Sequence, residues 1–258
     1  MVFNYTSREK KALIIFILVL TLVFAFNDGQ ETFDLGFWLI NFLKILVIVA
    51  IGALVHDLGH DLMCRKYGFN SEFRLWGMKR LGFTKHPLYP KTYNILGFKW
   101  TIYQFPLGIL LALIVMVLSN GKLFWAAISS YGLVVERAHR LGRRYVEVTD
   151  FEEAKIALAG PMFLLALTLI LKIFNGAGMF DKFILIYSLI VVYDMLPLPG
   201  LDGSKVYWGS RPLFAFSFVF TIAAIAAIYM LNVWIALLLA LGLSLVFLVI
   251  YYYLKIYK

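Results

Sequence analysis

The sequence predicts an all-α polytopic membrane protein with about six to eight transmembrane helices. Of its 258 residues, 62% are hydrophobic and 15% are charged, against roughly 45–50% and about 25% in soluble globular domains. The mean hydropathy is +0.84. The apolar residues form runs too long for a soluble fold to bury, so we expect hydrocarbon to surround most of the chain.

The apolar runs predict the helices in order. Residues 10–26 follow the basic segment SREKK and precede no small-residue cleavage site, so we interpret them as a retained helix. The next run begins near Gly36 and continues into the polar string HDLGHD, giving a helix of about 26 residues. Further runs predict helices at 101–118, 155–174, 182–196, 213–231 and 233–254. Residues 123–135 are too short to span, and either a return segment or a hairpin fits them.

The Lys and Arg residues predict the orientation. Eight of them lie between residues 65 and 100, whereas residues 27–35 include three acidic residues and no basic one. Because cytoplasmic loops are rich in Lys and Arg, we expect a multi-pass cell-membrane protein with both termini in the cytoplasm. The Arg-rich run 137–144 fits the same side. The net charge of +9 therefore favours a lipid bilayer with anionic headgroups over nucleic acid as the partner.

A first polar motif, HDLGHD, begins at His56 and continues the second predicted helix. Residues four apart share a helix face, so His56 and His60 could hold one divalent ion while Asp57, about 100° around the helix, flanks it. The H-E-x-x-H zinc sites have this geometry. The alternative is a chance histidine pair at a cytoplasmic helix end. We expect His86 and His139 to be solvated loop residues.

A second polar motif, YDMLPLPGLDG, covers residues 193–203. Pro197 and Pro199 cannot continue a regular helix, so we expect the backbone to unwind near the inner membrane face. The unwound segment could direct Asp202 at a neighbouring helix. The alternative is an ordinary cytoplasmic loop that holds Asp202 in a turn.

The two motifs both end helices that run from outside to inside, so they lie at similar depth. His56, His60 and Asp202 could then complete one zinc site, with one Zn²⁺ per chain. Three protein ligands and a water are typical of catalytic zinc, and the natural reaction is hydrolysis of an amide bond.

The order of HDLGH, Ala159-Gly160-Pro161 and LPLPGLDG resembles the site-2 protease family of intramembrane zinc metalloproteases over about residues 50–210. The strings GFNSEFRLWG and LDGSKVYWG are similar to its archaeal and bacterial branch. The resemblance implies zinc held by His56, His60 and Asp202, and a transmembrane protein or peptide as substrate. It also implies a small membrane-associated β element at about residues 72–100, after the HDLGH helix, whose edge could receive an extended substrate.

We expect one integral membrane domain over residues 1–258. Its parts are a first helix with an outer loop (1–35), a metalloprotease-like core (36–210) with an insertion at about 84–153, and a C-terminal helical pair (211–258). Neither the substrate nor an oligomeric state follows from the sequence.

Two residues depart from the family pattern. The family's general base is Glu, and Asp57 stands in that position with a carboxylate that reaches about one methylene less far. A displacement of about 1 Å can cost about 100-fold in rate. Asp57 could act through a repositioned water, belong to a weakened enzyme, or mark lost hydrolysis. The family usually has Asn where this chain has Asp194, and a carboxyl group can donate a hydrogen bond to an oxyanion only when it is neutral.

The leading prediction is an intramembrane zinc metalloprotease that hydrolyses peptide bonds of membrane-spanning substrates, using metal-activated water with Asp57 in the general-base position. The alternative is a catalytically weakened or inactive protease-like protein that binds metal and client helices. A transporter is disfavoured because the sequence shows no inverted repeat.

Overall fold

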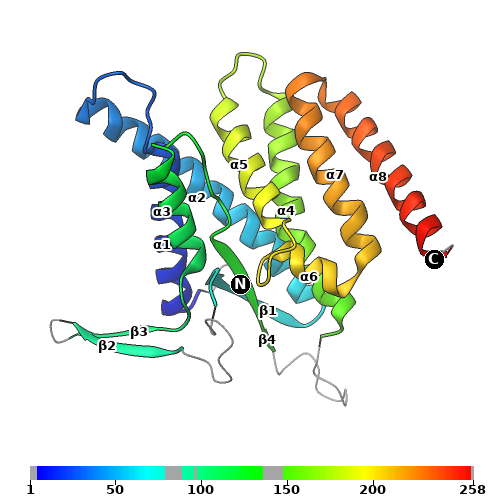
Figure 1. The fold of residues 1–258 in the computed structure, drawn as a ribbon, viewed down its shortest axis with the longest axis horizontal. Helices are drawn as coiled ribbons and strands as arrows, with labels where there is room; N and C mark the ends of the chain where they lie inside the picture. The colour runs from blue at the N-terminus through cyan, green and yellow to red at the C-terminus, as the bar shows by residue number, and fades with distance from the viewer. Residues whose placement is uncertain (1–4, 79–88, 96–97, 136–147, 257–258) are drawn as a thin grey trace.

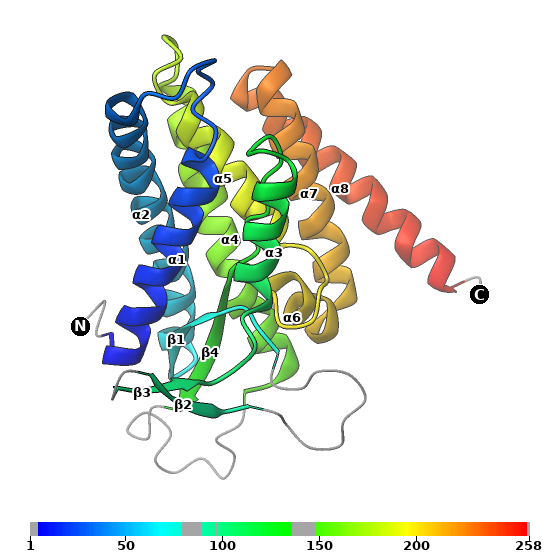
Figure 2. The same ribbon diagram turned by 60° about the vertical axis from the view of Figure 1, so that its left-hand side comes forward.

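A computed structural model describes residues 5–78, 89–95, 98–135 and 148–256 as a helical bundle with short strands at one end (Figures 1 and 2). The helices are α1 (Ser7–Ala25), α2 (Leu35–Lys66), α3 (Leu107–Leu118), α4 (Asp150–Ile173), α5 (Asp181–Asp194), α6 (Asp202–Gly209), α7 (Arg211–Met230) and α8 (Val233–Ile256). The strands are β1 (Phe69–Leu75), β2 (Lys91–Ile95), β3 (Phe98–Ile102) and β4 (Ser129–Val135).

Four helices of the described residues, α2, α4, α7 and α8, are long and apolar enough to cross a membrane. The predicted six to eight crossings are therefore not confirmed. Helix α1 begins with the charged sequence SREKK, and α3 and α5 have only 12 and 14 residues. At 1.5 Å per residue, these two helices are about 18 and 21 Å long, below the roughly 30 Å of a hydrocarbon core.

Helix α2 extends beyond its predicted end and reaches Lys66, with 32 residues in all. Asp61 forms an ion pair with Arg65 one turn later, with Oδ2 of Asp61 2.8 Å from the guanidinium. Two basic residues occupy the last turn of the helix. Both features stabilise the C-terminal end of a helix. Gly68, with φ of 78°, ends the helix in the left-handed region that favours glycine. His56 therefore lies about 15 Å before the end of α2.

The prediction for residues 101–118 was wrong in its first part. Residues 98–102 form β3, paired with β2, and helix α3 begins only after Pro106. Residues 123–135 form no return helix: β4 pairs antiparallel with the distant β1, from Phe69 opposite Val135 to Leu75 opposite Ser129. The hairpin prediction would pair residues 131–137 with residues 143–148, most of which lie outside the described residues. The Arg-rich run and His139 also lie outside them, in 136–147, as does His86, in 79–88.

The β element after α2 is present, but parts of its outer edges are engaged. The N–H of Phe73 in β1 donates to Glu9 at 3.2 Å, and the carbonyl of Leu75 accepts from Gln104. On β4, the carbonyl of Tyr131 accepts from Lys205 at 2.8 Å. A substrate strand added at these positions has to displace a side chain, and the strand-addition prediction remains untested.

Candidate metal centre

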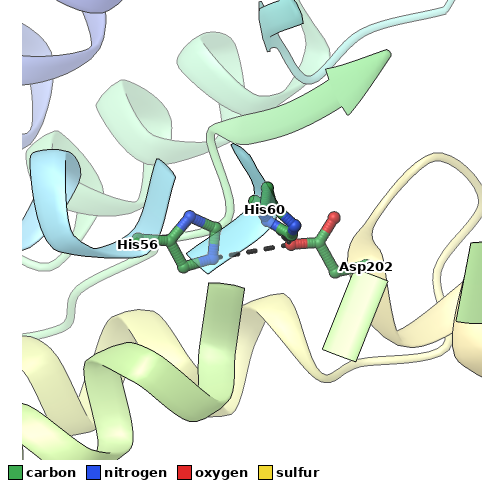
Figure 3. A group of neighbouring side chains, drawn as sticks. All are labelled: His56, His60 and Asp202. Atoms are coloured by element: carbon green, nitrogen blue, oxygen red, sulfur yellow. Dashed lines mark hydrogen bonds and ion pairs between the residues drawn. The ribbon is translucent and has the colours of Figure 1, made fainter. Parts of the chain in front are cut away.

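Three buried side chains converge where α2 meets α6 (Figure 3). His56 and His60 project from successive turns of α2, and Asp202 is the first residue of α6. Oδ2 of Asp202 lies 3.0 Å from Nε2 of His60 and 3.5 Å from Nε2 of His56. The three residues offer donor atoms within 4.8 Å of one another. The structure thus brings together the three residues that were predicted from the sequence to form one site. Their role as metal ligands remains a prediction.

The orientation of His60 fits a cation at this point. Nδ1 of His60 lies 2.8 Å from the carbonyl oxygen of Ile156, so Nδ1 carries the proton of this hydrogen bond. In a neutral imidazole, Nε2 then has a lone pair, and this lone pair faces a carboxylate oxygen of Asp202. The two acceptor atoms lie only 3.0 Å apart, and this arrangement is stable only when a proton or a metal ion is shared between them. A backbone carbonyl that fixes the histidine tautomer is a common feature of metal sites.

Other polar atoms of the cluster have no hydrogen-bond partner among the described residues. They are Nε2 of His56, Oδ1 of Asp202 and Oδ2 of Asp194, and all three are buried. Unpaired buried polar atoms are costly, and a bound ion is one of the few arrangements that compensate them. Imidazole nitrogens with carboxylate oxygens form a donor set that suits zinc.

Two glycines allow α2 to approach α4 closely enough to build the site. A Cβ on Gly59 would lie 2.6 Å from the carbonyl oxygen of Ala159, and one on Gly160 would lie 2.2 Å from Nε2 of His60. Neither distance is tolerable for a side chain. Gly160, the middle residue of the Ala-Gly-Pro motif, therefore leaves the space that the His60 ring occupies.

The segment between α5 and α6 is unwound, as the prolines predicted. Helix α5 ends at Asp194, and α6 begins at Asp202. The indole N–H of Trp76 donates to the carbonyl of Pro199 at 2.9 Å and ties the segment to the β element. Gly203 lies so close to Met195 that an added Cβ would be 2.1 Å from its carbonyl oxygen. These contacts hold Asp202 against α2.

Asp194 lies beside the cluster. Its Oδ2 is 3.1 Å from Nε2 of His56, at ion-pair distance but without hydrogen-bond alignment. Its side chain is 1% exposed. It therefore faces His56 as a second carboxylate, and the oxyanion role proposed for it needs its neutral form.

Asp57 stands outside the group of three, and its carboxylate has a different partner. The hydroxyl of Tyr5 donates to Oδ2 of Asp57 at 2.6 Å. Burial, followed by the charge of Asp57, raises the pKa of the Tyr5 hydroxyl. Tyr5 is therefore a hydrogen-bond donor at neutral pH. The sequence did not indicate this contact, which joins residues 52 positions apart.

Sequence reasoning also missed Tyr131 and Lys205. The Tyr131 ring stacks on His60 with centroids 4.4 Å apart. The amine of Lys205 donates to the Tyr131 carbonyl and lies 3.8 Å from Oδ1 of Asp202. Burial lowers the pKa of Lys205, while Asp202 opposes the shift. Lys205 follows Asp202 by one helical turn, and this spacing is a signal that could have identified it.

Comparison with known proteins finds a relative of this chain. Over 215 residues, the chain is 26% identical to a protein of Methanocaldococcus jannaschii named "Putative zinc metalloprotease", and the match covers 80% of this chain and 86% of that protein. No family model and no solved structure matches the chain. The similarity supports a zinc metalloprotease at a coarse level, and the buried His-His-Asp cluster is compatible with zinc.

Proposed function

We propose that this protein is an intramembrane zinc endopeptidase that hydrolyses peptide bonds of membrane-spanning substrates. The observation that carries the proposal is the convergence of His56, His60 and Asp202, three buried residues from two helices, on one point. The similarity to a protein named as a zinc metalloprotease supports the same chemistry. Four helices able to cross a membrane support its place in the bilayer.

In this proposal, His56, His60 and Asp202 hold one zinc ion. When bound there, zinc would lower the pKa of a water molecule towards about 7 and would polarise a carbonyl group. Asp57, which follows His56 directly, would accept a proton from the attacking water as the new C–O bond forms. It would then deliver this proton to the nitrogen of the leaving amine as the peptide C–N bond breaks. Asp194, in its neutral form, donates a hydrogen bond to the carbonyl oxygen.

The proposed substrate is a transmembrane protein or peptide whose helix has unwound near the scissile bond. Strand β4 is the element of the sheet next to the site, because its Tyr131 stacks on His60. An extended substrate could pair with this edge once Lys205 releases the Tyr131 carbonyl.

The second candidate is a protein that binds metal and client helices without efficient cleavage. One observation favours it: the residue in the general-base position is Asp57, whose carboxylate reaches about one methylene less far than that of the Glu that the family resemblance implies. Asp57→Glu separates the two candidates. Cleavage that appears only in the Glu variant favours the inactive protein, and cleavage that is faster with Asp57 favours the enzyme.

The test of the proposal uses purified full-length protein in liposomes with a transmembrane test substrate. We expect about one zinc per chain, cleavage that a chelator abolishes, and loss of both in His60→Ala and Asp202→Asn. His139→Ala is the matched control and should retain both. Full cleavage in the absence of any bound metal would contradict the proposal.

A further inference from the structure

The N-terminal segment reaches the general-base position. The hydroxyl of Tyr5 lies 2.6 Å from Oδ2 of Asp57, a distance typical of a hydroxyl hydrogen bond to a charged oxygen. Asp57 is buried and Tyr5 is half-buried. The contact is therefore shielded from water, which makes such a bond stronger than one at the surface.

The backbone next to Tyr5 is fixed by a capping box. The N–H of Thr6 donates to one carboxylate oxygen of Glu9 at 2.7 Å, and the N–H of Glu9 donates to the Thr6 hydroxyl. The other carboxylate oxygen of Glu9 accepts the N–H of Phe73 in β1 at 3.2 Å. One buried carboxylate thus joins the start of α1 to the β element.

A second pair of contacts holds the same turn of α1. The guanidinium of Arg8 lies 3.6 Å from Glu72 and over the ring of Tyr103, 3.9 Å from its centroid. Since α1 is attached to the β element at both Arg8 and Glu9, the position of Tyr5 is set by the fold.

Asp57 needs such a contact because its side chain is short. The Asp side chain has two torsions, and its carboxylate reaches about one methylene less far than that of Glu. Few of its orientations therefore direct a carboxylate oxygen towards the candidate metal site. A donor on Oδ2 selects one orientation and directs Oδ1 elsewhere. A tyrosine hydroxyl on a fixed backbone is a donor of this kind.

We infer that Tyr5 is a positioning residue that holds the Asp57 carboxylate in its working orientation. For its effect on catalysis, this inference rests on the proposed function. The contact itself does not, and it is measurable in the metal-free protein.

The first experiment detects the contact without activity. 3-Fluorotyrosine is placed at position 5 of the metal-free, full-length protein, and its ¹⁹F resonance is recorded with and without Asp57→Asn. We expect a clear shift with Asp57→Asn. The control is Asp61→Asn, which changes a buried carboxylate one turn further along α2, and its shift should be much smaller. Equal shifts in the two variants would overturn the inference.

The second experiment measures the consequence. Tyr5→Phe removes only the hydroxyl, and we expect kcat to fall about 10- to 100-fold, the effect of losing one hydrogen bond to a charged group, with KM and zinc content unchanged. In the Asp57→Glu background, whose longer side chain does not need the same support, Tyr5→Phe should cost less than about threefold.

The matched control is Tyr187→Phe. The Tyr187 hydroxyl is buried and donates to the carbonyl of Ile48 at 2.9 Å, so this variant loses a buried tyrosine hydrogen bond away from Asp57. We expect it to leave kcat unchanged. Equal losses of kcat in Tyr5→Phe and Tyr187→Phe, or equal losses with Asp57 and Glu at position 57, would overturn the positioning role. If no variant cleaves, the proposed function fails, while the ¹⁹F shift still decides whether Tyr5 holds Asp57.

Discussion

Replacing Gly160 with alanine should remove the metal site and leave the fold intact. The new Cβ would lie 2.2 Å from Nε2 of His60, whereas ordinary contact begins at 3.4 Å. The ring must therefore move by at least about 1.2 Å, the difference between these distances. Metal–ligand distances tolerate only about 0.2 Å, so His60 can no longer serve with His56 and Asp202.

The same substitution has two opposing effects on the free energy of unfolding. Alanine is favoured over glycine inside a helix by about 1 kcal/mol, and an overpacked site costs about 1–3 kcal/mol. The net change in unfolding free energy is therefore about 0–2 kcal/mol. Zinc affinity should change far more, and cleavage should fall at least about 100-fold, the cost of a displacement of about 1 Å.

The assay is the zinc content of dialysed protein, together with its thermal unfolding. The control is Gly242→Ala in α8, where a Cβ would meet nothing within 4 Å, and this variant should bind zinc like the parent. Normal zinc binding by Gly160→Ala would refute the reasoning, because it would show that His60 can leave its position without loss of the site.

Three further predictions concern the metal and its surroundings. Zinc at about 100 times its Kd should raise the unfolding free energy by about 2.7 kcal/mol, measured by thermal unfolding with and without a chelator. In His60→Ala, zinc should leave the unfolding free energy unchanged. An equal stabilisation of His60→Ala by zinc would count against His60 as a ligand. His56→Ala should also prevent zinc binding in equilibrium dialysis, and retained stoichiometric zinc would exclude His56 as a ligand. Lys205→Met should lower the unfolding free energy of the zinc-free protein by about 1–3 kcal/mol, because the Tyr131 carbonyl and Asp202 lose the ammonium group beside them. An unchanged unfolding midpoint would contradict this prediction.

The parts of the fold that the sequence predicted well are those governed by one dominant interaction. Long apolar runs identified α2, α4, α7 and α8 because hydrocarbon selects for length and hydropathy. The starts of α1 and α4 had a signal that was not used: Thr6 with Glu9, and Thr149 with Glu152, are capping boxes.

The part that failed is the strand pairing. Residues 101 and 102, predicted to begin a helix, belong to β3 and pair with the neighbouring β2, whereas β4 pairs with a strand about 60 residues away. Pairing of this kind has no local signature beyond short alternation. The division of the chain into a core and two flanking parts, and the orientation of both termini, remain predictions.

The residues of the candidate metal centre could be selected from the sequence because they are few and chemically distinctive. Histidines four apart and an aspartate after paired prolines stand out in an apolar sequence. The residues around them do not. Tyr5 is one of 15 tyrosines, and only the folded chain shows that it, rather than another, contacts Asp57.

X-ray absorption at the zinc edge of the purified, zinc-loaded protein tests the central claim most directly. The predicted result is two imidazole nitrogens at about 2.0–2.1 Å, oxygen in the remaining positions and no sulfur at about 2.3 Å. His56→Ala, loaded with zinc and dialysed in the same way, should give no zinc signal. Cys64 lies one helical turn beyond His60 and is a free thiol, so it is the alternative ligand to exclude. Its coordination would appear as a zinc–sulfur distance. Sulfur coordination, or a spectrum unchanged by His56→Ala, would contradict the account.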